Sequence, residues 1–295
     1  MLRHEDLRLW YGWAELSPRD PIVAGSMGRW RVIYHVGRYG IAAGGGLKLV
    51  FRSASDWPAF QGRDPYEESF LTVSTNGRGK LAWRYDARGY LQPWPRAVTA
   101  DVSQWGLAEG DTVTFYLGDP EGGSPGVRAQ TFAEKGHEFR VVVDPFGIGQ
   151  YVAVPSPTVD IVGGEAARLV LTAPSTVRLG EPFALAIRVE DRWGNLAGGY
   201  AGEVKLEGLP GLEAVFLAEG DGGARWARGL RLSQEGIHRI QGREERLGLV
   251  AESNPIHVHA GDRRAAFALW GDLRGQSADT GGTGSAADYY RYARD

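Results

Sequence analysis

The chain of 295 residues contains no cysteine. Disulfide bridges, thiolate metal sites and a thiol nucleophile are therefore excluded, and the composition fits a reducing compartment. The N-terminal residues alternate in charge and lack the apolar core of a signal peptide. Together these features favour a cytoplasmic location.

Charge of one sign and long apolar runs are also scarce. The formal net charge is -3, and no more than two lysines or arginines follow one another. This excludes a strong general field for nucleic acid. No run of about 18 apolar residues occurs, so no membrane-spanning helix is expected. Neither nucleic acid nor a membrane is predicted as a partner.

Motifs for common phosphate-binding loops are missing. Glycine-rich loops lie at 44–46 and 122–126, but neither precedes a helix that opens with Lys-Ser or Lys-Thr. The P-loop and dinucleotide-binding interpretations therefore fail.

The chain is rich in glycine (43) and proline (15), and between them apolar residues alternate with polar ones. Trp30, Val32, Tyr34 and Val36 show this period of two, which predicts a strand with one buried face. The same period recurs at 47–51, 81–85, 113–117 and 139–143. A β-sandwich domain over residues 1–157 would bury such faces.

A second domain is expected after the proline-rich joint at 154–157. Its length and strand spacing suit an immunoglobulin-like β-sandwich without a disulfide, over residues 158–262. Strands are predicted at 168–172, 183–189, 204–206, 230–232, 237–240 and 247–251. Asp191 and Asn195 lie in a turn between two of these strands. The predicted class is all-β, with two sandwiches followed by a short, incomplete βα segment.

That segment covers residues 263–295. Residues 265–273 form an apolar run typical of a buried parallel strand, and 275–284 read as a loop. Ser285, with Asp288 three residues later, predicts a helix start. A parallel strand needs neighbours and covering helices, so this βα unit is not expected to be a domain by itself.

The Trp-Gly-Asp-Leu sequence at 270–273 resembles the first barrel strand of a bacterial family of unknown function. That family is related to the polymerase and histidinol phosphatase (PHP) metallohydrolases, and its barrel opens with Trp-Gly-Asp-Leu-His-Gly-Gln-Ser. Further segments resemble the leader region of the same family: 44–46, 55–57, 122–132, 162–166 and 253–256.

The resemblance implies a metal-dependent hydrolase, but the intact metal site is not expected in this protein. In PHP-like enzymes a histidine at the end of the first strand helps hold a divalent metal. Arg274 occupies that position, and a guanidinium has no lone pair for a metal. Asp272 and Asp279 stand where the family has acidic residues, as a remnant of the site. No catalytic residue and no cofactor are therefore predicted, although complete members should bind a divalent metal.

Other patterns allow alternatives. His257 and His259 would project from one strand face, as a metal pair or as solvated side chains. Trp57 and Trp94 lie near probable loops, where exposed rings could stack on sugars, or they could pack in the interior. Asp191, Asn195 and the turn at Asp119 could bind calcium, but Asx turns explain them more simply.

The leading hypothesis is a non-catalytic leader region of a PHP-like metal-dependent hydrolase, inactive by itself. Its expected partner is the missing C-terminal barrel or another protein surface. The alternative is a stand-alone β-sandwich binding module for a carbohydrate or protein ligand. A third interpretation is a gene fragment whose continuation encodes the barrel.

Overall fold

The computed structural model describes residues 3–261 and, beyond them, residues 275, 277, 282, 284–287, 289 and 290. The protein forms two compact units, Met1–Ile161 with Gly275–Asp295, and Val162–Arg274. The division falls at Ile161 rather than at Pro157. Strand β14 (Thr158–Val162) explains the difference, because it pairs with β11 (Glu134–Glu138) of the first unit.

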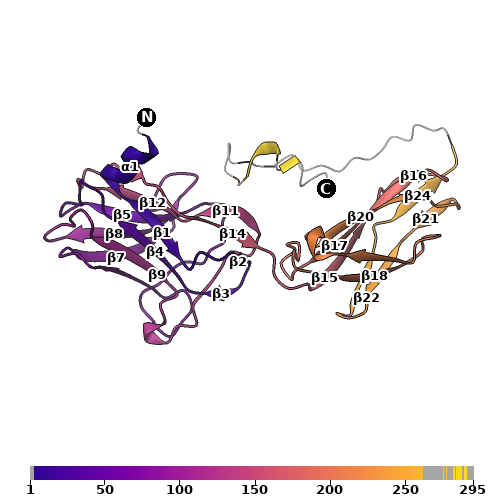
Figure 1. The fold of residues 1–295 in the computed structure, drawn as a ribbon, viewed down its shortest axis with the longest axis horizontal. Helices are drawn as coiled ribbons and strands as arrows, with labels where there is room; N and C mark the ends of the chain where they lie inside the picture. Colours follow the sequence, from indigo (N-terminus) through magenta and orange to yellow (C-terminus); the bar gives the residue numbers. More distant parts are fainter. Residues whose placement is uncertain are drawn as a thin grey trace. The chain divides into compact units, whose positions relative to one another are not determined.

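The first unit is a β-sandwich (Figure 1). Its two main sheets have the strand orders β1-β4-β9-β6 and β13-β12-β5-β8-β7, and smaller sheets join β11-β14-β2 and β10-β3. Their inner faces form one apolar core, with Val32 and Phe115 from the first sheet and Leu49 and Val141 from the second. The elements of this unit are α1 (His4–Tyr11), β1 (Trp13–Ser17), β2 (Ile22–Val23), β3 (Met27–Gly28), β4 (Trp30–His35), β5 (Gly46–Phe51), β6 (Leu71–Thr75), β7 (Lys80–Asp86), β8 (Arg96–Ser103), β9 (Thr112–Leu117), η1 (Pro120–Gly122), β10 (Val127–Arg128), β11, β12 (Arg140–Asp144), β13 (Val152–Ala153) and β14.

The alternation seen in the sequence determines these sheets. Trp30, Val32 and Tyr34 are buried in β4, whereas Arg31 between them is exposed. The strand therefore buries one face and leaves the other to solvent, as the period of two predicts. Helix α1 ends at Gly12, whose φ is 92°, and a Cβ there would lie 2.1 Å from the carbonyl oxygen of His35. Only glycine fits this left-handed, crowded position.

The second unit is also a β-sandwich. One sheet has the order β15-β17-β20, a second β19-β18-β22-β23, and a third β16-β24-β21. Strands β15, β17 and β20 match the A, B and E positions of an immunoglobulin-like sandwich, and β18, β22 and β23 match C, F and G. The elements are β15 (Arg168–Thr172), β16 (Thr176–Arg178), β17 (Phe183–Glu190), β18 (Gly202–Glu207), β19 (Ala214–Leu217), η2 (Glu219–Asp221), β20 (Ala224–Leu230), β21 (Gly236–His238), β22 (Gln241–Glu244), β23 (Leu249–Glu252) and β24 (Ile256–His259).

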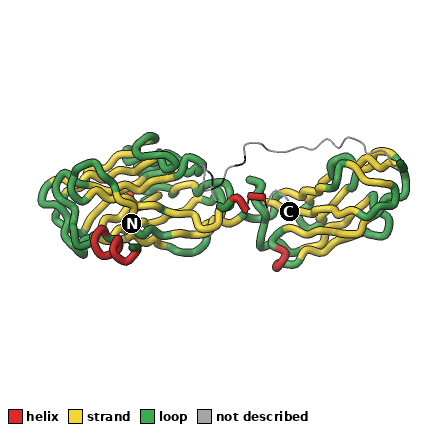
Figure 2. Tube along the Cα trace, turned by 90° about the horizontal axis from the view of Figure 1, so that it is seen from above, coloured by secondary structure: helices red, strands yellow, loops and turns green. Residues whose placement is uncertain are grey.

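The prediction of an all-β class is confirmed. Strands and their connecting loops make up most of both units, and the helices are short (Figure 2). The predicted strand at 168–172 coincides with β15, but the one at 230–232 is wrong because β20 ends at Leu230. No helix among the described residues is long and apolar enough to cross a membrane.

The predicted strand at 265–273 lies outside the described residues. The predicted helix start at Ser285 is visible in part, because the amide of Tyr289 donates a hydrogen bond to the carbonyl of Ser285 at 3.0 Å. Residues 286, 287, 289 and 290 are helical.

Candidate functional site

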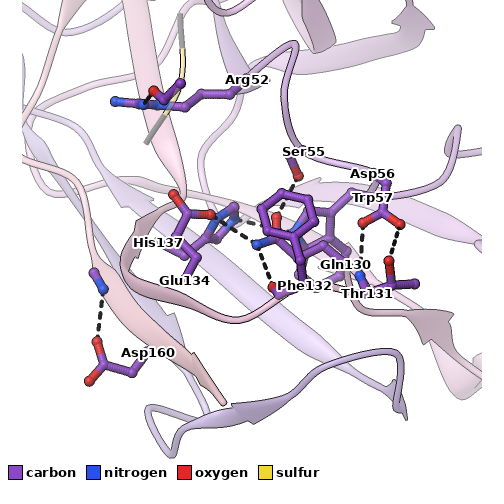
Figure 3. Close-up of polar contacts among 12 residues, drawn as sticks. Arg52, Ser55, Asp56, Trp57, Gln130, Thr131, Phe132, Glu134, His137 and Asp160 are labelled. Carbon is purple, nitrogen blue, oxygen red and sulfur yellow. Dashed lines mark hydrogen bonds and ion pairs between the residues drawn. The ribbon is translucent and has the colours of Figure 1, made fainter. Parts of the chain in front are cut away.

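A buried polar network of the first unit joins two loops to strand β11 (Figure 3). The indole Nε1 of Trp57 donates to Nε2 of His137 at 3.2 Å, and Nδ1 of His137 lies 2.8 Å from Oε2 of Glu134. Gln130 donates through Nε2 to the same Glu134 oxygen at 2.9 Å, and its Oε1 accepts from Oγ of Ser55 at 2.8 Å. The network thus links residues far apart in the sequence.

A β-bulge brings Glu134 and His137 to the same side of β11. Residues three apart on a regular strand point to opposite faces. Here the register with β14 shifts between Glu134 and His137, and Gly136 within this stretch has a φ of 68°. The bulge re-aims the side chains so that the carboxylate and the imidazole meet.

The hydrogen bonds define the state of the imidazole. An indole N–H only donates, so Nε2 of His137 must accept and carry no proton. Nδ1 then carries the proton and donates to Glu134. The imidazole is 3% exposed and neutral in this arrangement. Both of its nitrogens are occupied within the protein.

The surroundings of the Glu134 carboxyl also change its pKa. Burial alone raises its pKa, but the interaction with His137, the hydrogen bond from Gln130 and the charge of Arg52 together outweigh it. The pKa of Glu134 therefore lies below its ordinary value, and the group is an anion at neutral pH.

Two further side chains, Arg96 and Asp56, hold the loop that carries Ser55 and Trp57. Arg96 donates to the backbone carbonyls of Arg52, Ser55 and Trp57. Asp56 accepts from the amide and the hydroxyl of Thr131 at 2.8 and 2.7 Å. The network is therefore rigidly supported on both sides.

The described contacts of this network do not include a Ser–His pair. The hydroxyl of Ser55 donates to Gln130 and not to the imidazole, so it is not an activated nucleophile. The indole of Trp57 is hydrogen-bonded to Nε2 of His137, the nitrogen that a general base would use. Among the described residues, no group of three or more His, Cys, Asp or Glu side chains could hold a metal ion.

The two tryptophans proposed as sugar platforms are buried. Trp57 is 1% exposed and Trp94 is 5% exposed, so neither offers an open ring face, and this interpretation is wrong for both. Trp57 packs edge-to-face with Trp30 in the main core. The guanidinium groups of Arg52 and Arg140 lie 4.9 and 4.3 Å from the Trp94 ring.

Arg52 also contacts the C-terminal part of the protein. Its guanidinium donates to the carbonyl oxygen of Gly282, 230 residues later in the sequence. Within the same part, the ring of Tyr289 leaves no room for a side chain at Gly275, because a Cβ there would lie 2.3 Å from the ring. Residues Gly275–Asp295 cluster with the first unit. The first unit thus includes residues from the C-terminal part of the chain.

The remaining predicted site residues divide into two groups. Asp272, Arg274 and Asp279 lie outside the described residues. His257 and His259 are on β24, and their ring centroids are 5.9 Å apart. They share one face as expected, but the described part of the sequence supplies no third ligand for a metal there.

The turn at Asp191 is built by hydrogen bonds. Its carboxylate accepts from the amides of Gly164, Trp193 and Asn195 at 2.8–2.9 Å and from the side chain of Asn195 at 2.9 Å. Burial raises the pKa of Asp191, but these four donors outweigh it and lower the pKa below its ordinary value. Asp119 similarly accepts from Glu121 and Thr72. Both turns fit the Asx interpretation.

Surface hollows are a feature that the sequence does not predict. In the first unit, a cavity of about 560 Å³ is lined by Arg8, Trp13 and His35, with His35 stacked on Trp13 at 4.1 Å and paired with Glu15 at 3.1 Å. In the second unit, a groove of about 750 Å³ runs along β19 and β20. The sequence signal for this groove is the series of arginines at 225, 228 and 231.

Comparison with known proteins gives relatives but no family. No family model matches the sequence. An uncharacterized protein of Chlamydia trachomatis is 27% identical over 289 residues, which cover 92% of this chain and 45% of that protein. Uncharacterized proteins of Chlamydia muridarum and Chlamydia pneumoniae are 29% and 28% identical over 201 residues. The chain therefore spans less than half the length of these relatives.

Proposed function

We propose that the protein is a non-catalytic β-sandwich leader region of a PHP-like metal-dependent hydrolase, and that it supports the beginning of the barrel without performing chemistry. The contact between Arg52 and Gly282 is the observation that carries the proposal. Gly282 lies in the sequence that follows the barrel-like residues 270–273, and this contact supports a role of the first sandwich in holding that part of the protein.

The polar groups of the described residues agree with a supporting role. The His137–Glu134 pair is closed by Trp57 and has no free nitrogen for a substrate or metal. His257 and His259 have no third ligand within the described residues. The divalent metal of complete PHP-like enzymes would need ligands beyond Asp272 and Asp279, since Arg274 cannot coordinate a cation.

Turnover assays of the purified protein test the proposal. The protein is incubated with p-nitrophenyl phosphate and added manganese, zinc or magnesium, with and without a chelator. We expect no metal-dependent hydrolysis. Hydrolysis that is lost on chelation and in Asp272→Ala, but kept in the exposed control Asp20→Ala, would overturn the proposal.

A second test addresses support of the C-terminal segment. Arg52→Ala should make the residues after 275 more sensitive to limited proteolysis, since the contact with Gly282 is lost. Arg78→Ala removes an exposed arginine from the same unit and should leave the cleavage pattern unchanged. Equal cleavage of both variants and the parent protein would show that Arg52 does not hold the segment.

A further inference from the structure

The groove in the second unit lies between the edges of two sheets. Strand β19 ends the four-stranded sheet and β20 ends the β15-β17-β20 sheet, and no other described strand pairs with their outer sides. An edge strand presents backbone N–H and C=O groups that can pair with another extended segment. The groove therefore offers backbone recognition along its length.

Side chains give the groove a definite chemistry. All of the charged residues that line it are arginines, namely Arg225, Arg228 and Arg231. Exposed aromatic rings add apolar contact, since Phe216 is 60% and Trp226 is 37% exposed. The surface is therefore complementary to a ligand that carries both carboxylates and apolar side chains.

The partners of the three arginines leave the positive charge largely uncompensated. Arg225 pairs with Asp221 at 2.9 Å, whereas Arg231 donates to the carbonyl of Gly180, which carries no formal charge. The guanidinium of Arg228 lies 5.6 Å from the Trp226 ring. Two of the three cations are thus without a carboxylate among the contacts observed in the described residues.

The floor and the length of β20 indicate how a ligand would lie. Ala227 and Leu230 line the groove and belong to the apolar core. Residues alternate between two faces along an added strand, so one set of its side chains can contact apolar surface while the other meets the arginines. Strand β20 has seven residues and β19 has four, which favours β20 as the template.

We propose that the groove binds an extended peptide segment of a partner protein, with alternating acidic and apolar residues, as an additional strand on the edge of β20. Recognition of this kind uses backbone hydrogen bonds for affinity and side-chain contacts for specificity. A second copy of the same edge is a poor occupant, because arginine would face arginine.

Fluorescence anisotropy with the 295-residue protein tests the proposal. The probe is a fluorescein-labelled peptide of alternating glutamate and valine, and the comparison peptide has lysine in place of glutamate. We expect binding of the glutamate peptide alone. Arg228→Glu combined with Arg231→Glu should weaken it by about tenfold or more.

A matched variant controls for the change in charge. Lys205→Glu combined with Arg243→Glu reverses two charges on β18 and β22, at a separate hollow of the same unit. It should change the affinity by less than about twofold. If the double variant Arg228→Glu, Arg231→Glu unfolds, a second double variant, Arg228→Gln with Arg231→Gln, removes the charges without reversing them. It should still weaken binding by about threefold.

Hydrogen exchange identifies the mode of binding. On binding the peptide, amides of β20 should exchange more slowly, while those of the buried strand β17 should not change. Absence of peptide binding, or binding without protection of β20, would overturn the proposal. Tight binding of heparin that depends on the same arginines but does not protect β20 would also overturn it. So would self-association in sedimentation velocity that Arg228→Glu combined with Arg231→Glu abolishes.

Discussion

The indole of Trp57 donates a hydrogen bond to His137 at 3.2 Å in an interior where the two residues are 1% and 3% exposed. His137 in turn donates a hydrogen bond through Nδ1 to Glu134. One aromatic side chain therefore determines the tautomer of a histidine and, through it, the environment of a carboxylate. Packing and polar order in the first sandwich are therefore coupled at this point.

Substitution of Trp57 should destabilise the first unit in two graded steps. Trp57→Phe keeps much of the apolar contact but removes the donor to His137, at a cost of about 1–3 kcal/mol for the unpaired buried nitrogen. Trp57→Ala also leaves a cavity and should cost about 3–5 kcal/mol. Urea denaturation followed by circular dichroism measures both. A Trp57→Phe variant as stable as the parent protein would mean that the hydrogen bond contributes nothing.

Glu134 should make stability depend on pH on the acid side. Its pKa is lower in the folded state than in the unfolded one, so the unfolded state binds a proton more readily. The stabilisation is complete above the unfolded pKa of about 4.3 and decreases as the pH falls through the folded value.

Unfolding free energies measured between neutral pH and acid, for the parent protein and Glu134→Gln, test this. The glutamine variant should be less stable at pH 7 and should lose less on acidification. Glu121→Gln changes a carboxylate of the same unit outside the network and serves as the control. Parallel pH profiles for the parent protein and Glu134→Gln would contradict the assignment.

The strands that the sequence predicts correctly are those in which apolar and polar residues alternate. Val113, Phe115 and Leu117 alternate in β9 and are all buried, because packing of two sheets imposes the period. The predicted strand at 230–232 lies too late in the sequence, because Arg225 and Arg228 interrupt the apolar pattern of β20. Alternation therefore locates the central strand β9 and the edge strands β7 and β15 alike, but not β20, where the pattern is broken.

Loop residues were harder to assign. Trp57 and Trp94 lie outside regular strands, where no periodicity indicates the direction of a side chain, and both turn inward. The pairing of Glu134 with His137 depends on a bulge at Gly136, which strand periodicity does not anticipate. The polar network consequently required tertiary structure to be recognised.

The Asp191 turn should depend on the carboxylate and not on calcium. Asp191 is 2% exposed and accepts hydrogen bonds from Gly164, Trp193 and Asn195. Asp191→Ala leaves those amides unpaired and should destabilise the second unit by about 2 kcal/mol. Glu181→Ala, at an exposed position of the same unit, should have little effect. A melting temperature that rises on addition of calcium and falls with a chelator would instead support a metal site.

The C-terminal segment should contribute little to the stability of the first sandwich. The core of that unit is formed by residues up to Ile161, and the contact with Gly282 is made by the partly exposed side chain of Arg52. Deleting residues 265–295 should therefore lower the free energy of unfolding by about 1 kcal/mol or less, or a few degrees in melting temperature. Calorimetry of the 295-residue and shortened proteins measures the difference. Arg52→Ala should cost more in the 295-residue protein than in the shortened one, because the contact with Gly282 is lost only in the former. The loss of the contact with Trp94 is common to both. A large drop on deletion that Arg52→Ala does not share would mean that other contacts integrate the segment into the fold.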